Sequence, residues 1–183
     1  MLGGQQDITG GRAAAPSSLL LPCFAAPVTE RVWLVAAHGG AGCSTIYRSA
    51  PGLYADAGRA LPVSPDPVRP AMVVLCAMGS ARGLESLRAL LAEWHAGRWG
   101  ATVLLGVAVT DCMARQPRVL NRARLQVTSP APCAWRLPYV PSLPVEGVPD
   151  RWPAAYMRMD GQVDRARAGS SVHDTAGRSE NRQ

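Results

Sequence analysis

The residues of this chain that could do chemistry are concentrated in one glycine-rich segment, His38-Gly39-Gly40-Ala41-Gly42-Cys43-Ser44-Thr45. Successive backbone N–H groups freed by glycines can converge on the oxygens of one phosphate when such a segment opens a helix. The hydroxyls of Ser44 and Thr45 are of the kind that holds Mg²⁺ beside a bound phosphate. The segment therefore predicts a phosphate or nucleotide site, with a purely structural turn as the alternative.

A phosphate site also needs positive charge, and the chain contains no lysine. All 19 of its basic residues are arginines. An arginine such as Arg48, in the helix expected after the loop, would have to take lysine's place. The imidazolium of His38 is a second candidate, although a histidine at a strand end is more often a satisfied structural residue. Without lysine we expect weak binding and slow or absent hydrolysis, so an efficient NTPase is not expected.

The five cysteines offer a weaker alternative chemistry. Cys43, beside the start of a helix, stands where a thiol can become a nucleophile, but His38 is the only base in its neighbourhood of the sequence. The odd number and the absence of C-x-x-C spacing argue against a zinc site or a secreted disulfide framework. They favour reduced thiols in a cytoplasmic protein.

The elements that must position the loop follow from the apolar pattern. Apolar runs predict strands over 31–37, 71–77 and 101–109, with a short fourth strand at 134–137. Helices are expected over 44–49, resuming at 53–59, over 79–98, and weakly over 118–125. Strand, helix and strand in succession predict right-handed parallel crossovers. The fold class is therefore α/β: a mostly parallel sheet flanked by helices, in three α/β/α layers.

The chain of 183 residues is long enough for one domain with a sizeable core. Residues 1–28 show no periodicity and are predicted to be a flexible arm. Residues 29–158 would form the α/β domain, within which the proline-rich stretch 62–70 reads as a connector. Residues 159–183 have few apolar anchors and are predicted to be a disordered tail.

The glycine loop resembles the deviant Walker A segment of the ParA/MinD family, K-G-G-x-G-K-[ST]-[ST], with which it matches at all three glycines and both hydroxyl positions. His38 and Cys43 stand where that family has its two lysines. The chain also looks like a group of actinobacterial proteins with lysine-free loops, often near mobile elements. The resemblance implies a truncated phosphate-loop NTPase-like fold with ATP and Mg²⁺ as its ligands.

Downstream the resemblance thins. Asp111 follows an expected strand where the family has a base-reading polar residue, and Pro138–Pro141 is similar to the segment after it. Only Asp56 and Asp66 are candidates for the Walker B aspartate. The family forms dimers in which the first loop lysine reaches the partner's phosphates, so a homodimer is implied, but His38 replaces that lysine and the oligomeric state stays open.

Charge and hydropathy bound the function further. A net charge of +6 favours an anionic partner, yet the arginines are scattered along the chain. The apolar stretches at 13–28 and 101–109 are broken by prolines or too short to span a membrane. Three functions stay open: a weak ATP or phosphate binder, a pseudo-NTPase that acts as a protein-interaction platform in plasmid or mobile-element maintenance, and a basic DNA-associated accessory protein.

Overall fold

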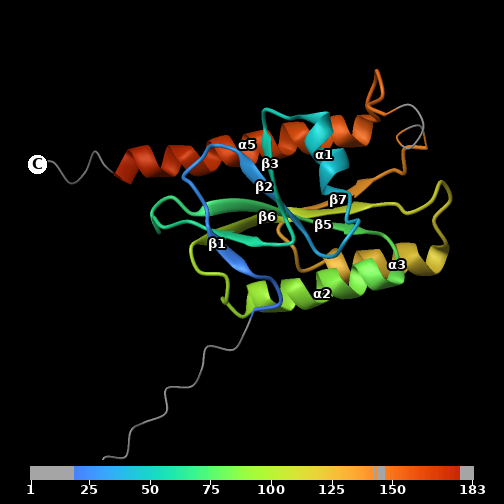
Figure 1. The fold of residues 1–183 in the computed structure, drawn as a ribbon, viewed down its shortest axis with the longest axis horizontal. Coiled ribbons are helices and arrows are strands. Elements are labelled where there is room, and N and C mark those ends of the chain that lie inside the picture. Colours follow the sequence, from blue (N-terminus) through green and yellow to red (C-terminus); the bar gives the residue numbers. More distant parts are fainter. Residues whose placement is uncertain (1–18, 142, 144–146, 178–183) are drawn as a thin grey trace, which may run out of the picture.

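The structure is a computed structural model and describes residues 19–141, 143 and 147–177. Its main sheet has five strands, all parallel, in the order β3-β2-β5-β6-β7 (Figure 1). They are β2 (Val32–Ala36), β3 (Tyr54–Gly58), β5 (Ala71–Met78), β6 (Thr102–Thr110) and β7 (Ala134–Leu137). A separate parallel pair joins β1 (Cys23–Ala25) to β4 (Leu61–Val63). The four predicted strands are confirmed.

Helices cover both faces of the main sheet (Figure 1). On one face lie α1 (Cys43–Ser49) and α5 (Ala154–Gly177), and on the other lie α2 (Ala81–His95) and α3 (Arg118–Thr128). Each face has its own apolar core, one built around the leucines of α2 and the other around Ile46 of α1 and Met159 of α5. The predicted three-layer α/β/α arrangement is confirmed.

The chain reverses its direction of travel across the sheet between β2 and β5. From β2 it passes through α1 to the neighbouring strand β3, whereas from β5 it passes through α2 and α3 to β6 and β7 on the other side. Right-handed crossovers in opposite directions place their helices on opposite faces, as observed. Numbered in chain order, the five strands run 2-1-3-4-5, the order of flavodoxin-like doubly wound sheets. In such sheets ligands bind beyond the carboxyl ends of the strands at the switch point, here between β2 and β5.

The predicted resumption of a helix over 53–59 is wrong, because this segment is the edge strand β3. Tyr54 at its start is fully buried in the core on the α1 and α5 face, and the burial of the following residues alternates along the strand. β3 pairs in parallel with β2. Whether a short segment with small residues forms a strand depends on pairing with a neighbouring strand, and the local sequence does not show which segment that neighbour is. The connector at 62–70 is also shorter than predicted, since its first residues belong to β4.

The predicted disordered tail at 159–183 is wrong for the described residues, which continue the long helix α5 as far as Gly177. Tyr156, Met159 and Val163 are fully buried at i, i+3 and i+7, and they fix the helix to the sheet. This apolar stripe is narrow, and the many arginines and glycines around it make the segment polar on average. Its composition therefore predicts disorder instead of a helix. Residues 178–183 lie outside the described part of the chain.

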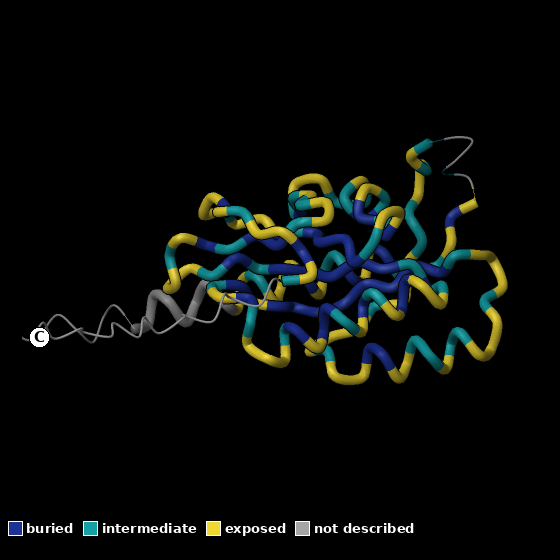
Figure 2. Tube along the Cα trace, turned by 60° about the horizontal axis from the view of Figure 1, so that its bottom comes forward, coloured by how far each residue is buried: buried dark blue, intermediate teal, exposed yellow. Residues whose placement is uncertain are grey.

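The predicted flexible arm at 1–28 also needs correction. Residues 1–18 lie outside the described part, but from Leu19 onward the segment is packed against the domain. Leu21 is buried, Phe24 meets Trp33 edge to face, and β1 pairs with β4. Figure 2 shows the buried residues concentrated along the strands and on the inward faces of the helices.

Candidate functional site

A cleft of about 550 Å³ opens beyond the carboxyl ends of the strands at the switch point. All eight residues of the glycine loop, from His38 to Thr45, line it. The rest of its wall comes from other elements and includes Asp56, Arg59, Met78, Thr110, Tyr139 and Tyr156. The structure thus brings the predicted loop together with residues up to 118 positions away in the sequence.

The loop lines this cleft in a backbone conformation that depends on glycine. Gly40 and Gly42 have φ values of +78° and +89°, which side chains other than glycine rarely adopt. Gly42 is the N-cap of α1, and its carbonyl accepts the N–H groups of Thr45 and Ile46, each at 3.1 Å. Within the described part of the chain, the N–H groups of residues 39–44 donate no hydrogen bond. They form an open cradle for an acceptor such as a phosphate oxygen.

His38 is held by hydrogen bonds at both ring nitrogens. The N–H of Met78 donates to Nε2 at 3.1 Å, and Nδ1 lies 2.8 Å from the carbonyl of Gly39. With Nε2 as the acceptor, the tautomer that satisfies both contacts carries its proton on Nδ1. A Cβ at Gly83 would lie 2.8 Å from Nε2, so the first turn of α2 closes over the ring. His38 therefore links β2, β5 and α2, and both of its ring nitrogens are taken up by backbone groups.

The thiol of Cys43 belongs to the apolar core between α1 and the sheet, with 6% of the residue exposed. Hydrogen bonding of the Cys76 thiol to Cys43, followed by complete burial, raises the pKa of Cys76 well above its ordinary value. The candidate base for a Cys43 nucleophile, His38, has its Nε2 lone pair occupied by Met78. The geometry therefore offers Cys43 no proton acceptor.

Ser44 is exposed and Thr45 is half-buried at the wall of the cleft. Neither hydroxyl has a hydrogen-bond partner among the described residues, so both are free to meet a ligand or a Mg²⁺ ion. Asp56 is the carboxylate that lines the same cleft, and its Oδ1 accepts the N–H of Gly58 at 2.8 Å. Hydroxyl and carboxylate oxygens of this kind suit Mg²⁺ shared with phosphates. Asp66, the other candidate, caps a turn by accepting the N–H of Val68.

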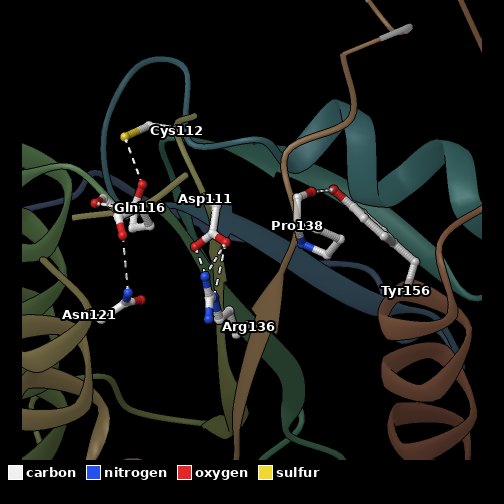
Figure 3. Close-up of polar contacts among 8 residues, drawn as sticks. Asp111, Cys112, Gln116, Asn121, Arg136, Pro138 and Tyr156 are labelled. Carbon is white, nitrogen blue, oxygen red and sulfur yellow. Dashed lines mark hydrogen bonds and ion pairs between the residues drawn. The ribbon is translucent and has the colours of Figure 1, made fainter. Parts of the chain in front are cut away.

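Asp111 is taken up by an ion pair, and it is not among the residues that line the cleft (Figure 3). Both of its carboxylate oxygens accept hydrogen bonds from Arg136 of β7, at 2.8–3.1 Å. Its own N–H donates to the carbonyl of Leu137. Asp111 thereby fastens β6 to β7, and a hydrogen bond from it to a nucleotide base would require breaking this pair.

Among the residues of the cleft wall that were not predicted from the sequence are Arg59, Thr110 and Tyr156. Arg59 is exposed at the turn after β3, whereas the predicted Arg48 is not among the lining residues. Thr110 is 6% exposed, and its hydroxyl makes no hydrogen bond of ordinary geometry. Burial raises the pKa of Tyr156 to about 12, with the nearby Thr110 hydroxyl acting in the opposite direction, and its phenol donates to the carbonyl of Pro138 (Figure 3). Only the fold brings these positions to the loop.

No protein-family model, curated protein or solved structure matches the chain. The described residues include no helix that could cross a membrane. In the same residues no three histidine, cysteine or acidic side chains gather in a way that could hold a metal ion by themselves. The function of the cleft is therefore inferred from its geometry.

Proposed function

We propose that this protein binds a nucleotide such as ATP, or a related phosphate compound, weakly and with little or no hydrolysis. The observation that carries the proposal is the open row of loop N–H groups in the wall of the switch-point cleft. A degenerate phosphate-loop relationship of the ParA/MinD kind agrees with this use of the loop. The cleft volume of about 550 Å³ falls in the range of small-molecule sites.

Binding without efficient hydrolysis follows from the groups in the cleft. Phosphoryl transfer needs cations that neutralise charge on the γ-phosphate and a group that orients the attacking water. The loop supplies neither lysine, because His38 and Cys43 occupy both positions and are turned to structural contacts. Asp56 already accepts the N–H of Gly58 and has no described partner that would orient it toward a water. On this proposal the loop backbone binds phosphate, while the described residues of the cleft lack the cations and the water-orienting group that fast cleavage needs.

The proposal is tested by calorimetric titration of the full chain with ATP and Mg²⁺, comparing Gly40→Ala with Gly97→Ala. Both glycines have positive φ, +78° and +67°, and a Cβ at either would meet nothing within 4 Å. Each substitution should therefore cost a similar free energy of folding, about 1–2 kcal/mol. Only Gly40 lies in the loop, so we expect Gly40→Ala to weaken ATP binding about tenfold, because the strained residue rotates the neighbouring N–H groups away from the ligand.

Gly97→Ala should bind ATP as the wild type does. Equal affinity for the two variants would show that the loop conformation does not matter to binding. If the wild type binds no ATP at millimolar concentration, the proposal is contradicted and the second candidate function is favoured. That candidate is a pseudo-NTPase that binds protein partners at the cleft face. The engagement of His38 with Met78 and Gly39 favours that candidate, because it makes the loop part of the architecture.

A further inference from the structure

Among the residues that line the cleft, histidine, carboxylate and guanidinium side chains each occur once, as His38, Asp56 and Arg59. Both ring nitrogens of His38 are engaged by the backbone, Nε2 by the N–H of Met78 and Nδ1 by the carbonyl of Gly39. The guanidinium of Arg59 is therefore the formal positive charge in the cleft wall. Arg59 is exposed, and within the described part of the chain it forms no ion pair. An arginine on the wall of a cleft that forms no ion pair there is available to an anionic ligand.

The turn that carries Arg59 is well defined at both ends. Before it, β3 pairs with β2 of the main sheet, and after it, β4 pairs with β1. Within the turn, Gly58 has a φ of +58° and its N–H donates to Oδ1 of Asp56 at 2.8 Å. These contacts hold the backbone of Arg59 beside the glycine loop, leaving only side-chain freedom to be lost on binding.

We propose that Arg59 supplies the cation that the loop lacks, and that the cleft selects compounds containing a pyrophosphate group. The inference rests on the proposed function and names its charge partner and ligand class. A guanidinium presents parallel N–H donors that match two phosphate oxygens at once. The loop N–H groups bind one phosphate of the pair, while Arg59, which follows the neighbouring strand β3 at the same edge of the sheet, binds the other. A nucleoside diphosphate or triphosphate and free pyrophosphate share this chemistry.

The alternative cation, Arg48, is excluded by position. It lies in the last turn of α1, one helix length away from the loop N–H groups, and does not line the cleft. It is nevertheless exposed, like Arg59, and has no ion pair among the described residues. Arg48 is therefore a matched control, because removing it takes away the same charge from another exposed position that does not line the cleft.

The test titrates pyrophosphate, ATP and adenosine into the full-length wild type and into Arg59→Gln, Arg59→Lys and Arg48→Gln. We expect Arg59→Gln to weaken the binding of pyrophosphate and ATP about tenfold, the effect of losing one charge-assisted contact. Arg59→Lys should recover part of the affinity, because it restores the charge without the two-point geometry. Arg48→Gln should bind as the wild type does. Raising the salt concentration should weaken the wild type more than Arg59→Gln.

The outcomes separate the two proposals. If the wild type binds pyrophosphate and Arg59→Gln binds it equally well, the role of Arg59 is overturned while phosphate binding by the loop stands. Equal losses in Arg59→Gln and Arg48→Gln would also overturn it, since net charge alone would then explain the effect. If adenosine binds as tightly as ATP, pyrophosphate selection is wrong. If no phosphate compound binds the wild type, both proposals fall together.

Discussion

At the scale of single residues, Thr110 shows most clearly that the cleft wall differs from an ordinary core. It ends β6, it is nearly fully buried, and its hydroxyl makes no hydrogen bond of ordinary geometry in the described structure. A Cβ at Gly42 would lie 3.2 Å from this hydroxyl, so Thr110 also enforces glycine in the loop. A buried hydroxyl without a partner costs free energy that an apolar side chain of the same shape would not.

We therefore expect Thr110→Val to leave the unliganded protein as stable as the wild type or more stable by up to about 1 kcal/mol. Thermal unfolding followed by circular dichroism measures the change. A melting temperature clearly below that of the wild type would mean that the hydroxyl has a partner, of which the nearby phenol of Tyr156 is the first to examine. Combining Thr110→Val with Tyr156→Phe in a double-mutant cycle would then measure that coupling.

At the scale of elements, α5 is the helix that the polar composition of the C-terminal segment did not predict. Met159 is 0% exposed between α5 and the sheet, whereas Met157, two residues earlier on the same helix, is 58% exposed. Met159→Ala should lower the free energy of unfolding by about 2–5 kcal/mol, because it opens a cavity in a packed core. Met157→Ala should change it by less than about 0.5 kcal/mol. Urea denaturation of both variants is the measurement, and equal small effects would contradict the docking of α5.

The same helix makes the stability of the protein depend on pH through Asp160. Its Oδ1 accepts hydrogen bonds from Tyr54 of β3 at 2.8 Å and from Ser49 of α1 at 3.3 Å. Burial nevertheless raises the pKa of Asp160, and these two donors offset that effect only in part. The folded state therefore favours the protonated carboxyl, whose contribution is complete below the unfolded pKa of about 3.9 and is lost as the pH rises through the folded pKa.

Asp160→Asn replaces this carboxyl by a neutral acceptor that cannot ionise. We expect the variant and the wild type to be equally stable at the acid end, and the variant to gain relative to the wild type as the pH rises toward 7. Urea unfolding at a series of pH values from about 4 to 7 measures the difference. A difference that stays constant, or that shrinks with rising pH, would show that burial does not govern this carboxyl.

At the scale of the whole molecule, the sequence was sufficient for the layers and for the loop, because each of these is a local pattern. Apolar runs identify the buried strands, and the glycines followed by two hydroxyl residues mark the turn into α1. The remainder depends on partners far along the chain. β3 is a strand only beside β2, and Arg59 and Thr110 enter the cleft wall from the ends of two different strands. Hydrophobic periodicity is a local pattern and does not show which residues far apart in the sequence come into contact.

If Arg59 binds the ligand as proposed, the small sheet of β1 and β4 would give residues 23–25 a share in ligand affinity. The carbonyl of Pro22 accepts the N–H of Leu61, two residues after Arg59, at 2.8 Å, and the N–H of Ala26 donates to Val63 at 2.9 Å. Pairing with β1 thus preorganises the turn, so that the conformational entropy of the Arg59 backbone is lost during folding instead of during binding. A cut or modification near Cys23 would therefore loosen ligand binding from outside the cleft.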